Sequence, residues 1–186
     1  MKRWFSLLAV LALVAVACGG GDDGASATTQ PTPTTTQPAP TTTQATTTTQ
    51  PPATGSTADM AITEVVFDDH FTITNLGDAP VDVTGLWVCN RPFYVRLTAG
   101  VIAPGESLQV AASKINLSDG GGEVALYSSD NFDDSSAILD YVSWGSGGGR
   151  STEAADAGHW PAGETVTVSG ASISAPTGGA SPADWS

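Results

Sequence analysis

Carboxylates are the side chains of this sequence best suited to chemistry. Asp130, Asp133 and Asp134 crowd one short stretch, and Asp68 and Asp69 stand together in another. Ca²⁺ takes about six to eight oxygen ligands, often from loops, so Asp130, Asp133 and Asp134 form a candidate calcium site. The spacing of an EF-hand is absent, and acidic loops on a globular domain are more often a solvated surface. We therefore predict no cofactor, with calcium as the alternative.

Histidines could supply a general base. The chain contains His70 and His159, and either could form a triad with a serine and an aspartate. However, no Gly-x-Ser-x-Gly pattern frames a serine nucleophile. The turn Gly158–Pro161 around His159 is typical of a ring that packs against a sheet. The sequence therefore predicts that the chain is not an enzyme.

Cys18 follows an N-terminal segment that is typical of export. Two basic residues precede an apolar run from Trp4 to Val16, and the small residues just before Cys18 resemble a lipobox. The run is shorter than the roughly 20 residues that a membrane-spanning helix needs. We predict a lipoprotein signal peptide at residues 1–17 and lipid attachment at Cys18. Ordinary secretory cleavage is the alternative.

The second cysteine, Cys89, would then have no partner in the chain, which predicts a fold without a structural disulfide. It ends the apolar run Leu86–Cys89, and free cysteine in such a run is usually a small buried hydrophobe. A reactive thiol would need a nearby cation, and Arg91 is close in sequence. Burial is the favoured interpretation.

Basic residues are scarce. The chain has 6 lysines and arginines against 19 carboxylates, and two of the six precede the predicted cleavage site. Nucleic-acid binding depends on lysine and arginine contacts to phosphate, so we predict no nucleic-acid partner. The same deficit argues against docking on anionic lipid headgroups.

Residues 18–58 have the composition of a tether. They repeat Thr-Thr-Gln among prolines and contain no aromatic or large aliphatic residue, so they cannot bury enough apolar surface to fold. Proline favours an extended form of about 3.1 Å per residue. We predict a disordered stalk that carries the rest of the chain away from the membrane. Sugar attachment to its threonines is an open alternative.

Residues 59–186 predict one all-β domain. Apolar residues alternate with a period of two, and turn residues recur every ten or so positions. We expect strands at about 60–67, 70–75, 81–89, 93–97, 107–112, 123–128, 138–144 and 164–168. The large side chains most suited to fill the core are Trp87, Phe93, Tyr127, Trp144 and Trp160.

Four motifs in this region, in order and at matching spacing, resemble the lamin tail domain family. They are FTITNLGDAPVDVTGLWV at 71–88, VIAPGESLQV at 101–110, GGEVALYSSD at 121–130 and ILDYVSWG at 138–145; the ending SPADW at 181–185 is similar to the closing strand of many bacterial members. The resemblance implies an immunoglobulin-like β-sandwich. It also implies structural roles for Asn75, Gly77, Gly85, the Pro104–Gly105 corner and Asp140, and none of these is catalytic.

Bacterial members of that family are secreted or surface modules that mediate attachment or protein interaction. The resemblance therefore implies a lipid-anchored binding or adapter module on the cell surface, with a protein or an envelope glycan as partner. An exposed aromatic side chain such as Tyr94, Trp144 or Trp160 is the candidate ligand contact. The alternative is a structural spacer without a discrete ligand; a hydrolase accessory or a calcium-dependent adhesion module is more remote. Fold analogy alone carries function poorly.

Overall fold

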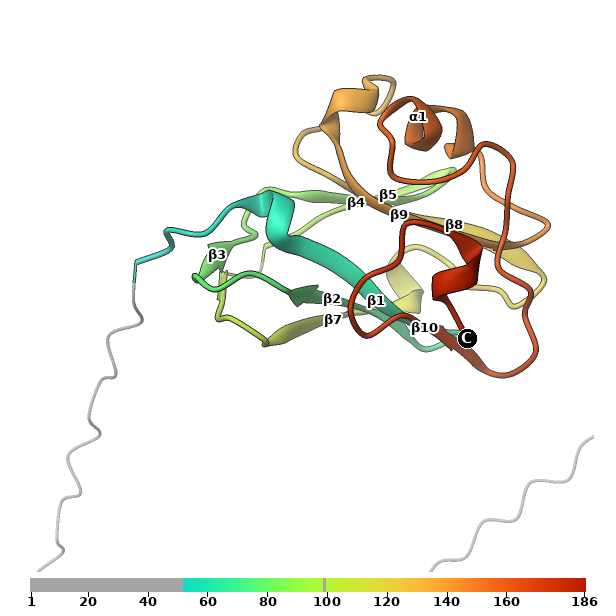
Figure 1. Cartoon of the computed structure of the whole chain (residues 1–186), viewed down its shortest axis with the longest axis horizontal. Coiled ribbons are helices and arrows are strands. Elements are labelled where there is room, and N and C mark those ends of the chain that lie inside the picture. Colours follow the sequence, from blue (N-terminus) through green and yellow to red (C-terminus); the bar gives the residue numbers. More distant parts are fainter. Residues whose placement is uncertain (1–51, 99) are drawn as a thin grey trace, which may run out of the picture. The chain divides into compact units, whose positions relative to one another are not determined.

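The computed structural model describes residues 52–98 and 100–186, and these form an all-β sandwich (Figure 1). In these ranges there are two four-stranded antiparallel sheets and one two-stranded sheet. The first sheet has the order β10-β1-β2-β7, with β10 at Ser172–Ser174, β1 at Met60–Val66, β2 at His70–Asn75 and β7 at Ser107–Ala111. The second has the order β5-β4-β8-β9, with β5 at Phe93–Arg96, β4 at Trp87–Asn90, β8 at Gly121–Tyr127 and β9 at Ile138–Gly145. The all-β sandwich predicted from the sequence is confirmed.

Short elements complete the domain. The small sheet pairs β3 at Val81–Asp82 with β6 at Val101–Ile102. The single α-helix of the described ranges is α1 at Ser151–Asp156, and four 3-10 turns are η1 at Thr57–Asp59, η2 at Ala112–Lys114, η3 at Ser135–Ala137 and η4 at Pro182–Asp184. No helix in the described part is long and apolar enough to cross a membrane.

The core lies between the two large sheets. Side chains alternate between the faces of a strand, so registered residues share a face. Val65, Phe71 and Val110 are registered across the first sheet, and Val88 and Leu126 across the second. All five are buried, and they belong to one hydrophobic cluster. This apolar alternation is the signal that made the strands predictable.

The second sheet is also buried on its outer face. Cys89, Tyr127 and Tyr141 alternate with the core residues and are nevertheless 0% exposed. The 3-10 turn η3 and the helix α1, which flank β9 in the sequence, cover this face together (Figure 1), and α1 contacts both β9 and η3. Because both faces are covered, almost all of β8 is buried rather than every second residue. The sheet therefore has a third layer that the strand pattern did not predict.

The outer face of the first sheet is polar. The hydroxyl of Thr74 lies 2.7 Å from that of Thr63 and 2.8 Å from that of Ser107, which gives a row of hydrogen bonds across three strands. Beside this row, the Thr72 hydroxyl donates to Glu64 Oε2 at 3.3 Å. This face fits the polar half of an alternating strand pattern with one side toward water.

Two of the expected strands were wrong, and three short elements were not expected. The predicted strand 81–89 is divided into β3 and β4, because Gly85 at φ +92° turns the chain between them. The predicted strand 164–168 is reduced to one bridge between Val166 and Trp144. β6, β10 and α1 were not predicted, since all three are very short.

The predicted signal peptide at 1–17, the lipidated Cys18 and nearly all of the stalk lie outside the described residues. These remain predictions. The end of the predicted stalk at residue 58 is wrong by a few residues, because Thr54 and Gly55 already donate their N–H groups to the Pro80 carbonyl at 3.0 and 2.8 Å, and η1 starts at Thr57.

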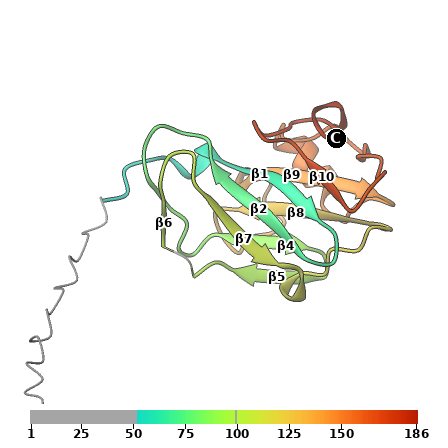
Figure 2. The same ribbon diagram turned by 90° about the horizontal axis from the view of Figure 1, so that it is seen from below.

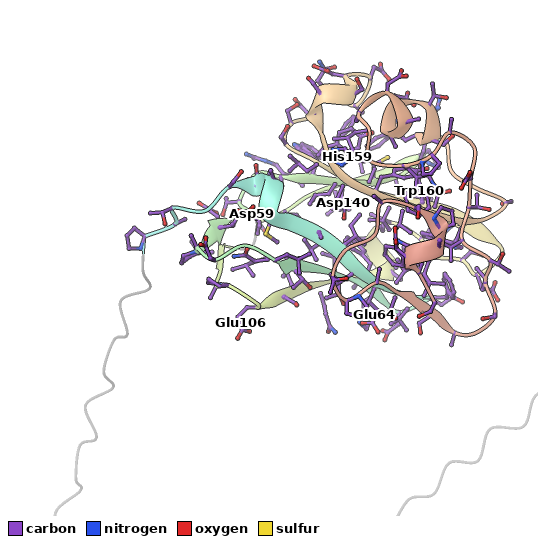
Figure 3. The ribbon with its side chains drawn as sticks, in the orientation of Figure 1. Asp59, Glu64, Glu106, Asp140, His159 and Trp160 are labelled. Atoms are coloured by element: carbon purple, nitrogen blue, oxygen red, sulfur yellow. The ribbon has the colours of Figure 1, made fainter. Side chains whose placement is uncertain are left out.

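Asp140 connects the two large sheets at the side where β9 passes β1 (Figure 3). Its Oδ2 accepts a hydrogen bond from the backbone N–H of Ile62 at 2.6 Å, next to an irregularity in the register of β1. Desolvation raises the pKa of this carboxyl to about 7, although the N–H groups of Ile62 and Tyr141 oppose the shift.

Replacing Asp140 with asparagine is expected to flatten the pH dependence of stability. Since the folded-state pKa lies above the ordinary value of 3.8, the folded chain binds more protons than the unfolded chain between about pH 4 and pH 7. The free energy of unfolding contributed by Asp140 must therefore fall as pH rises through this window. Urea unfolding of both proteins at the two ends of the window measures the difference.

Glu106→Gln provides a control, because Glu106 is exposed and its loss also removes one carboxylate. If the difference in stability between wild type and Asp140→Asn stays constant across the window, the raised pKa of Asp140 is contradicted.

Candidate binding surface

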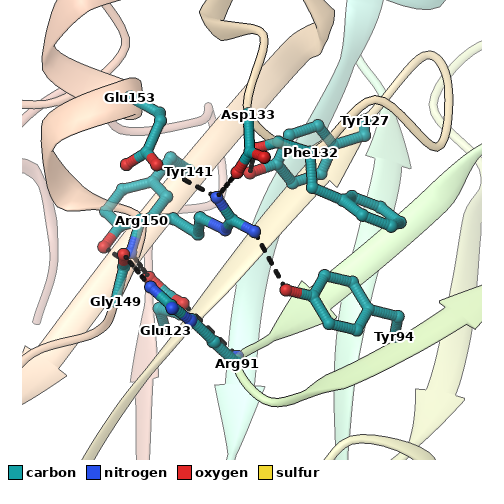
Figure 4. A network of polar contacts seen from close by, with 10 residues as sticks. All are labelled: Arg91, Tyr94, Glu123, Tyr127, Phe132, Asp133, Tyr141, Gly149, Arg150 and Glu153. Carbon is teal, nitrogen blue, oxygen red and sulfur yellow. Dashed lines mark hydrogen bonds and ion pairs between the residues drawn. The ribbon is translucent and has the colours of Figure 1, made fainter.

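A buried carboxylate, Glu123, lies on the outer face of the second sheet. It is 0% exposed and belongs to β8. Its carboxylate accepts hydrogen bonds from Tyr141 Oη at 2.9 Å, from the backbone N–H of Arg150 at 2.7 Å and from that of Arg91 at 3.3 Å (Figure 4). Burial of an unsatisfied carboxylate is very costly, so these three donors are what permits Glu123 to be there.

Arg150 adds a second set of contacts above this carboxylate. Its guanidinium donates from Nη1 to Asp133 Oδ1 at 2.7 Å and to Glu153 Oε1 at 3.0 Å, and from Nη2 to Tyr94 Oη at 3.0 Å. Burial opposes the charged form, but the bonds to Asp133, Tyr94 and Glu153 outweigh it and raise the pKa of Arg150 above its ordinary value. One side chain thereby joins β5, the loop before η3 and α1.

Phe132 fastens the same loop to the sheet. Its ring centroid lies 4.2 Å from that of Tyr94, 5.3 Å from that of Tyr127 and 5.6 Å from that of Trp87. Aromatic pairs at such separations add to the stability given by burial. Phe132 and Arg150 together hold Tyr94, and with it strand β5, against the third layer.

Cys89 lies beneath this network and is buried, as the sequence predicted. Desolvation and then the nearby Glu123 charge raise the pKa of its thiol to about 11, against the opposing effect of Arg150. A thiol that stays protonated and out of reach of solvent is a poor nucleophile. Cys89 is therefore a structural residue.

The third layer does not cover the outer edge of β5. Within the described part of the chain, β5 pairs only with β4, and β7 pairs only with β2. These two edge strands lie along the same side of the sandwich (Figure 2). Between them is a groove of about 420 Å³, whose lining includes Val95, Leu97, Leu108, Val110, Arg96 and Lys114.

The groove between β5 and β7 differs in charge from its surroundings. Its lining holds two cations, Arg96 and Lys114, and no carboxylate. Four other grooves formed by described residues each contain a carboxylate and no lysine or arginine; the carboxylates are Asp156, Glu64, Glu106 and Glu164. In so acidic a chain, this local excess of positive charge is distinctive.

Phe93 lies at the start of β5 and is 44% exposed. The prediction that it fills the core is wrong, since Phe93 is the first residue of an edge strand and is largely open to solvent. Arg91, also exposed, precedes it in the turn between β4 and β5. We call β5 with Phe93, the groove, Arg96 and Lys114 the β5 edge surface.

Of the three aromatic side chains predicted to contact a ligand, only Tyr94 is at this surface, half-buried on β5. Trp144 and Trp160 are 0% and 3% exposed, so the prediction that they are exposed contacts is wrong. Their indole N–H groups donate to the carbonyls of Ser118 and Glu164, each at 2.8 Å. The alternative prediction, that both belong to the core, is confirmed.

The three candidate calcium ligands are not brought together. Asp133 pairs with Arg150, and Asp134 accepts hydrogen bonds from the N–H and the hydroxyl of Ser136. Asp130 is exposed. No group of three or more metal-ligating side chains occurs in the described residues. In this loop, the Asp133 carboxylate pairs with Arg150, and the Asp134 carboxylate caps the start of η3.

The histidines do not form a triad. His70 contacts Asp69 at 3.1 Å and Gln109 at 3.0 Å on the polar face of the first sheet. His159 lies near α1 (Figure 3) and shares a pocket of about 280 Å³ with Ser136 and Asp156. The Ser136 hydroxyl donates to Asp134 at 2.7 Å and therefore not to His159, as a triad would require.

Sequence reasoning missed Glu123 and Arg150 as structural residues. Glu123 could have been noticed, because it is the one charged residue in the apolar strand Gly121–Tyr127. Arg150 gave no such signal, since it follows a glycine-rich stretch typical of a solvated loop. Its contacts come from segments far apart in the sequence.

Comparison with known proteins finds no matching family model, no similar curated protein and no similar solved structure. The resemblance to lamin tail domains therefore stays a prediction. The geometry of the β5 edge surface is the basis for the function proposed below.

Replacing Glu123 with glutamine is expected to lower the free energy of unfolding by about 1–3 kcal/mol. The carboxylate oxygens of Glu123 now accept from Tyr141 and from the N–H groups of Arg91 and Arg150. A glutamine would turn its NH₂ group toward at least one of these donors, which would leave that buried donor unsatisfied. Chemical denaturation measures the loss. Glu106→Gln is the matched control and should change stability by less than about 0.5 kcal/mol; equal effects of the two substitutions would contradict the structural role of Glu123.

Cys89 should resist alkylation by iodoacetamide in the folded chain at mildly alkaline pH and react fully in denaturant, because it is buried and its pKa is about 11. Peptide mass spectrometry locates the modification at Cys89 separately from Cys18. Rapid native labelling of Cys89 would show that the third layer opens readily.

Proposed function

We propose that this chain is a non-catalytic binding module that engages a protein partner through its β5 edge surface. The observation that carries the proposal is the combination, at one place, of an unpaired strand edge, an apolar groove, an exposed Phe93 and two cations in a groove without carboxylates. An apolar patch with a polar rim is typical of a protein interaction site.

The sequence predicts how this surface is presented to a partner. A lipid on Cys18 would hold the chain at the outer face of the cell membrane, and the stalk between Cys18 and the domain would set its reach. A tethered module needs a surface that can receive a partner, and the β5 edge surface is well suited to this.

A protein fits the β5 edge surface better than an envelope glycan does. An open strand edge offers backbone donors and acceptors at the spacing of another polypeptide strand. The tryptophans that a sugar ring could have used, Trp144 and Trp160, are buried. The partner predicted here is therefore a polypeptide.

The binding role is tested by photocrosslinking in cells. A photoreactive phenylalanine analogue at position 93 should yield a reproducible protein adduct. The same analogue at Leu76 is the matched control, because Leu76 is also 44% exposed but lies after β2 and not on β5.

Adducts at 93 but not at 76 support a discrete partner at the β5 edge surface. Equal and diffuse labelling at both positions would contradict the binding role and favour the alternative of a structural spacer.

A further inference from the structure

The backbone of β5 points hydrogen-bonding groups away from the domain at alternate residues. Leu97, just after β5, donates its N–H to the Leu86 carbonyl at 2.8 Å and accepts from the Gly85 N–H at 3.0 Å. In an antiparallel pair, residues that bond to the partner strand alternate with residues whose N–H and C=O point away. Counting back from Leu97, Tyr94 and Arg96 present their backbone groups at the open edge.

The side chains at this edge alternate in the same way. Tyr94 is registered with Cys89, so it lies on the face that carries the Arg150 network. Val95 is registered with Val88 and lies on the core side, where it lines the groove. Arg96 is registered with Trp87, so it lies on the same face as Tyr94 although it borders the groove. A strand added beside β5 would therefore place one set of side chains at the apolar groove beside Lys114, and the other set alongside Tyr94 and Arg96.

The charges at the edge specify which side chains fit. Arg96 and Lys114 are both exposed, and the groove contains no carboxylate to neutralise them. Opposite charges directly across a strand pair are stabilising, and like charges are destabilising.

We propose that the partner segment is an extended acidic stretch of another polypeptide, in which carboxylate and apolar residues alternate, and that it adds to β5 as a further strand. This rests on the proposed function and names the chemistry of its partner. Main-chain hydrogen bonds to Tyr94 and Arg96 would give affinity, while the groove and the two cations would give specificity.

Two other occupants fit less well. A second copy of this chain paired through β5 would bring like strands together, with the cations of each copy facing a positive edge. The chain's own stalk is interrupted by prolines, which have no N–H to donate to a strand pair. Cations on an edge strand can also serve only to prevent aggregation. In that case Arg96→Glu should cause self-association without weakening peptide binding.

The test uses the ¹⁵N-labelled full chain and a short blocked peptide that alternates glutamate with valine. Adding the peptide should shift the backbone amide resonances of Tyr94 and Arg96 in a saturable way. A lysine–valine peptide of equal length should not shift them. A glutamate–valine peptide with N-methyl groups on alternate backbone nitrogens separates strand pairing from charge, and should bind at least about tenfold more weakly.

Charge reversal at the groove gives the second part of the test. Arg96→Glu should weaken binding of the glutamate–valine peptide by about tenfold, because Arg96 lies on the face that would receive the carboxylates. Lys114→Glu, on the groove side with the valines, should weaken it less. Arg91→Glu makes the same change in charge outside the groove lining and should have a small effect by comparison. An unchanged thermal midpoint in each variant excludes unfolding as the cause.

Three results would overturn the inference. The first is equal binding of the glutamate–valine and lysine–valine peptides. The second is a set of resonance shifts confined to residues outside the β5 edge surface. The third is self-association of Arg96→Glu with undiminished peptide binding, which is expected if the cations only protect the edge from aggregation. If photocrosslinking at position 93 still captures a protein in any of these cases, the binding role survives and only the acidic strand is excluded.

Discussion

The arrangement of this domain depends on satisfying one buried carboxylate. Glu123 lies in the middle of a sheet covered on both faces, and its donors come from β9, from the turn after β4 and from the residue before α1. The chain must bring all three to the same place, because a buried charge without partners would destabilise the fold. Gly148 fits this requirement: a Cβ there would collide with Glu123.

This constraint links the interior to the surface. With the loop after Gly145 fixed over β8, Arg150 can reach Asp133, Glu153 and Tyr94, and Phe132 can pack on the sheet. One face of β5 is thereby tied down, while its outer edge is left open. The domain uses its most buried arginine for structure and leaves its other cations exposed, two of them in the β5–β7 groove.

The sequence predicted the elements whose signal is local. Alternating apolar residues located most strands within a residue or two, and the buried Cys89 followed from its apolar run. The candidate site could not be predicted in this way. Phe93 was assigned to the core because apolar character does not distinguish an edge strand from a central one, and Trp144 and Trp160 could not be assigned to surface or core. The contacts of Arg150 join residues up to 56 positions apart.

Amide hydrogen exchange of the full chain, free and bound to the partner recovered from cells, tests the central claim most directly. If a polypeptide strand adds to β5, the amides of Tyr94 and Arg96 exchange rapidly in the free chain and become strongly protected in the complex. Protection that appears instead on the polar face around Thr72 and Thr74, with Tyr94 and Arg96 unchanged, would contradict the account.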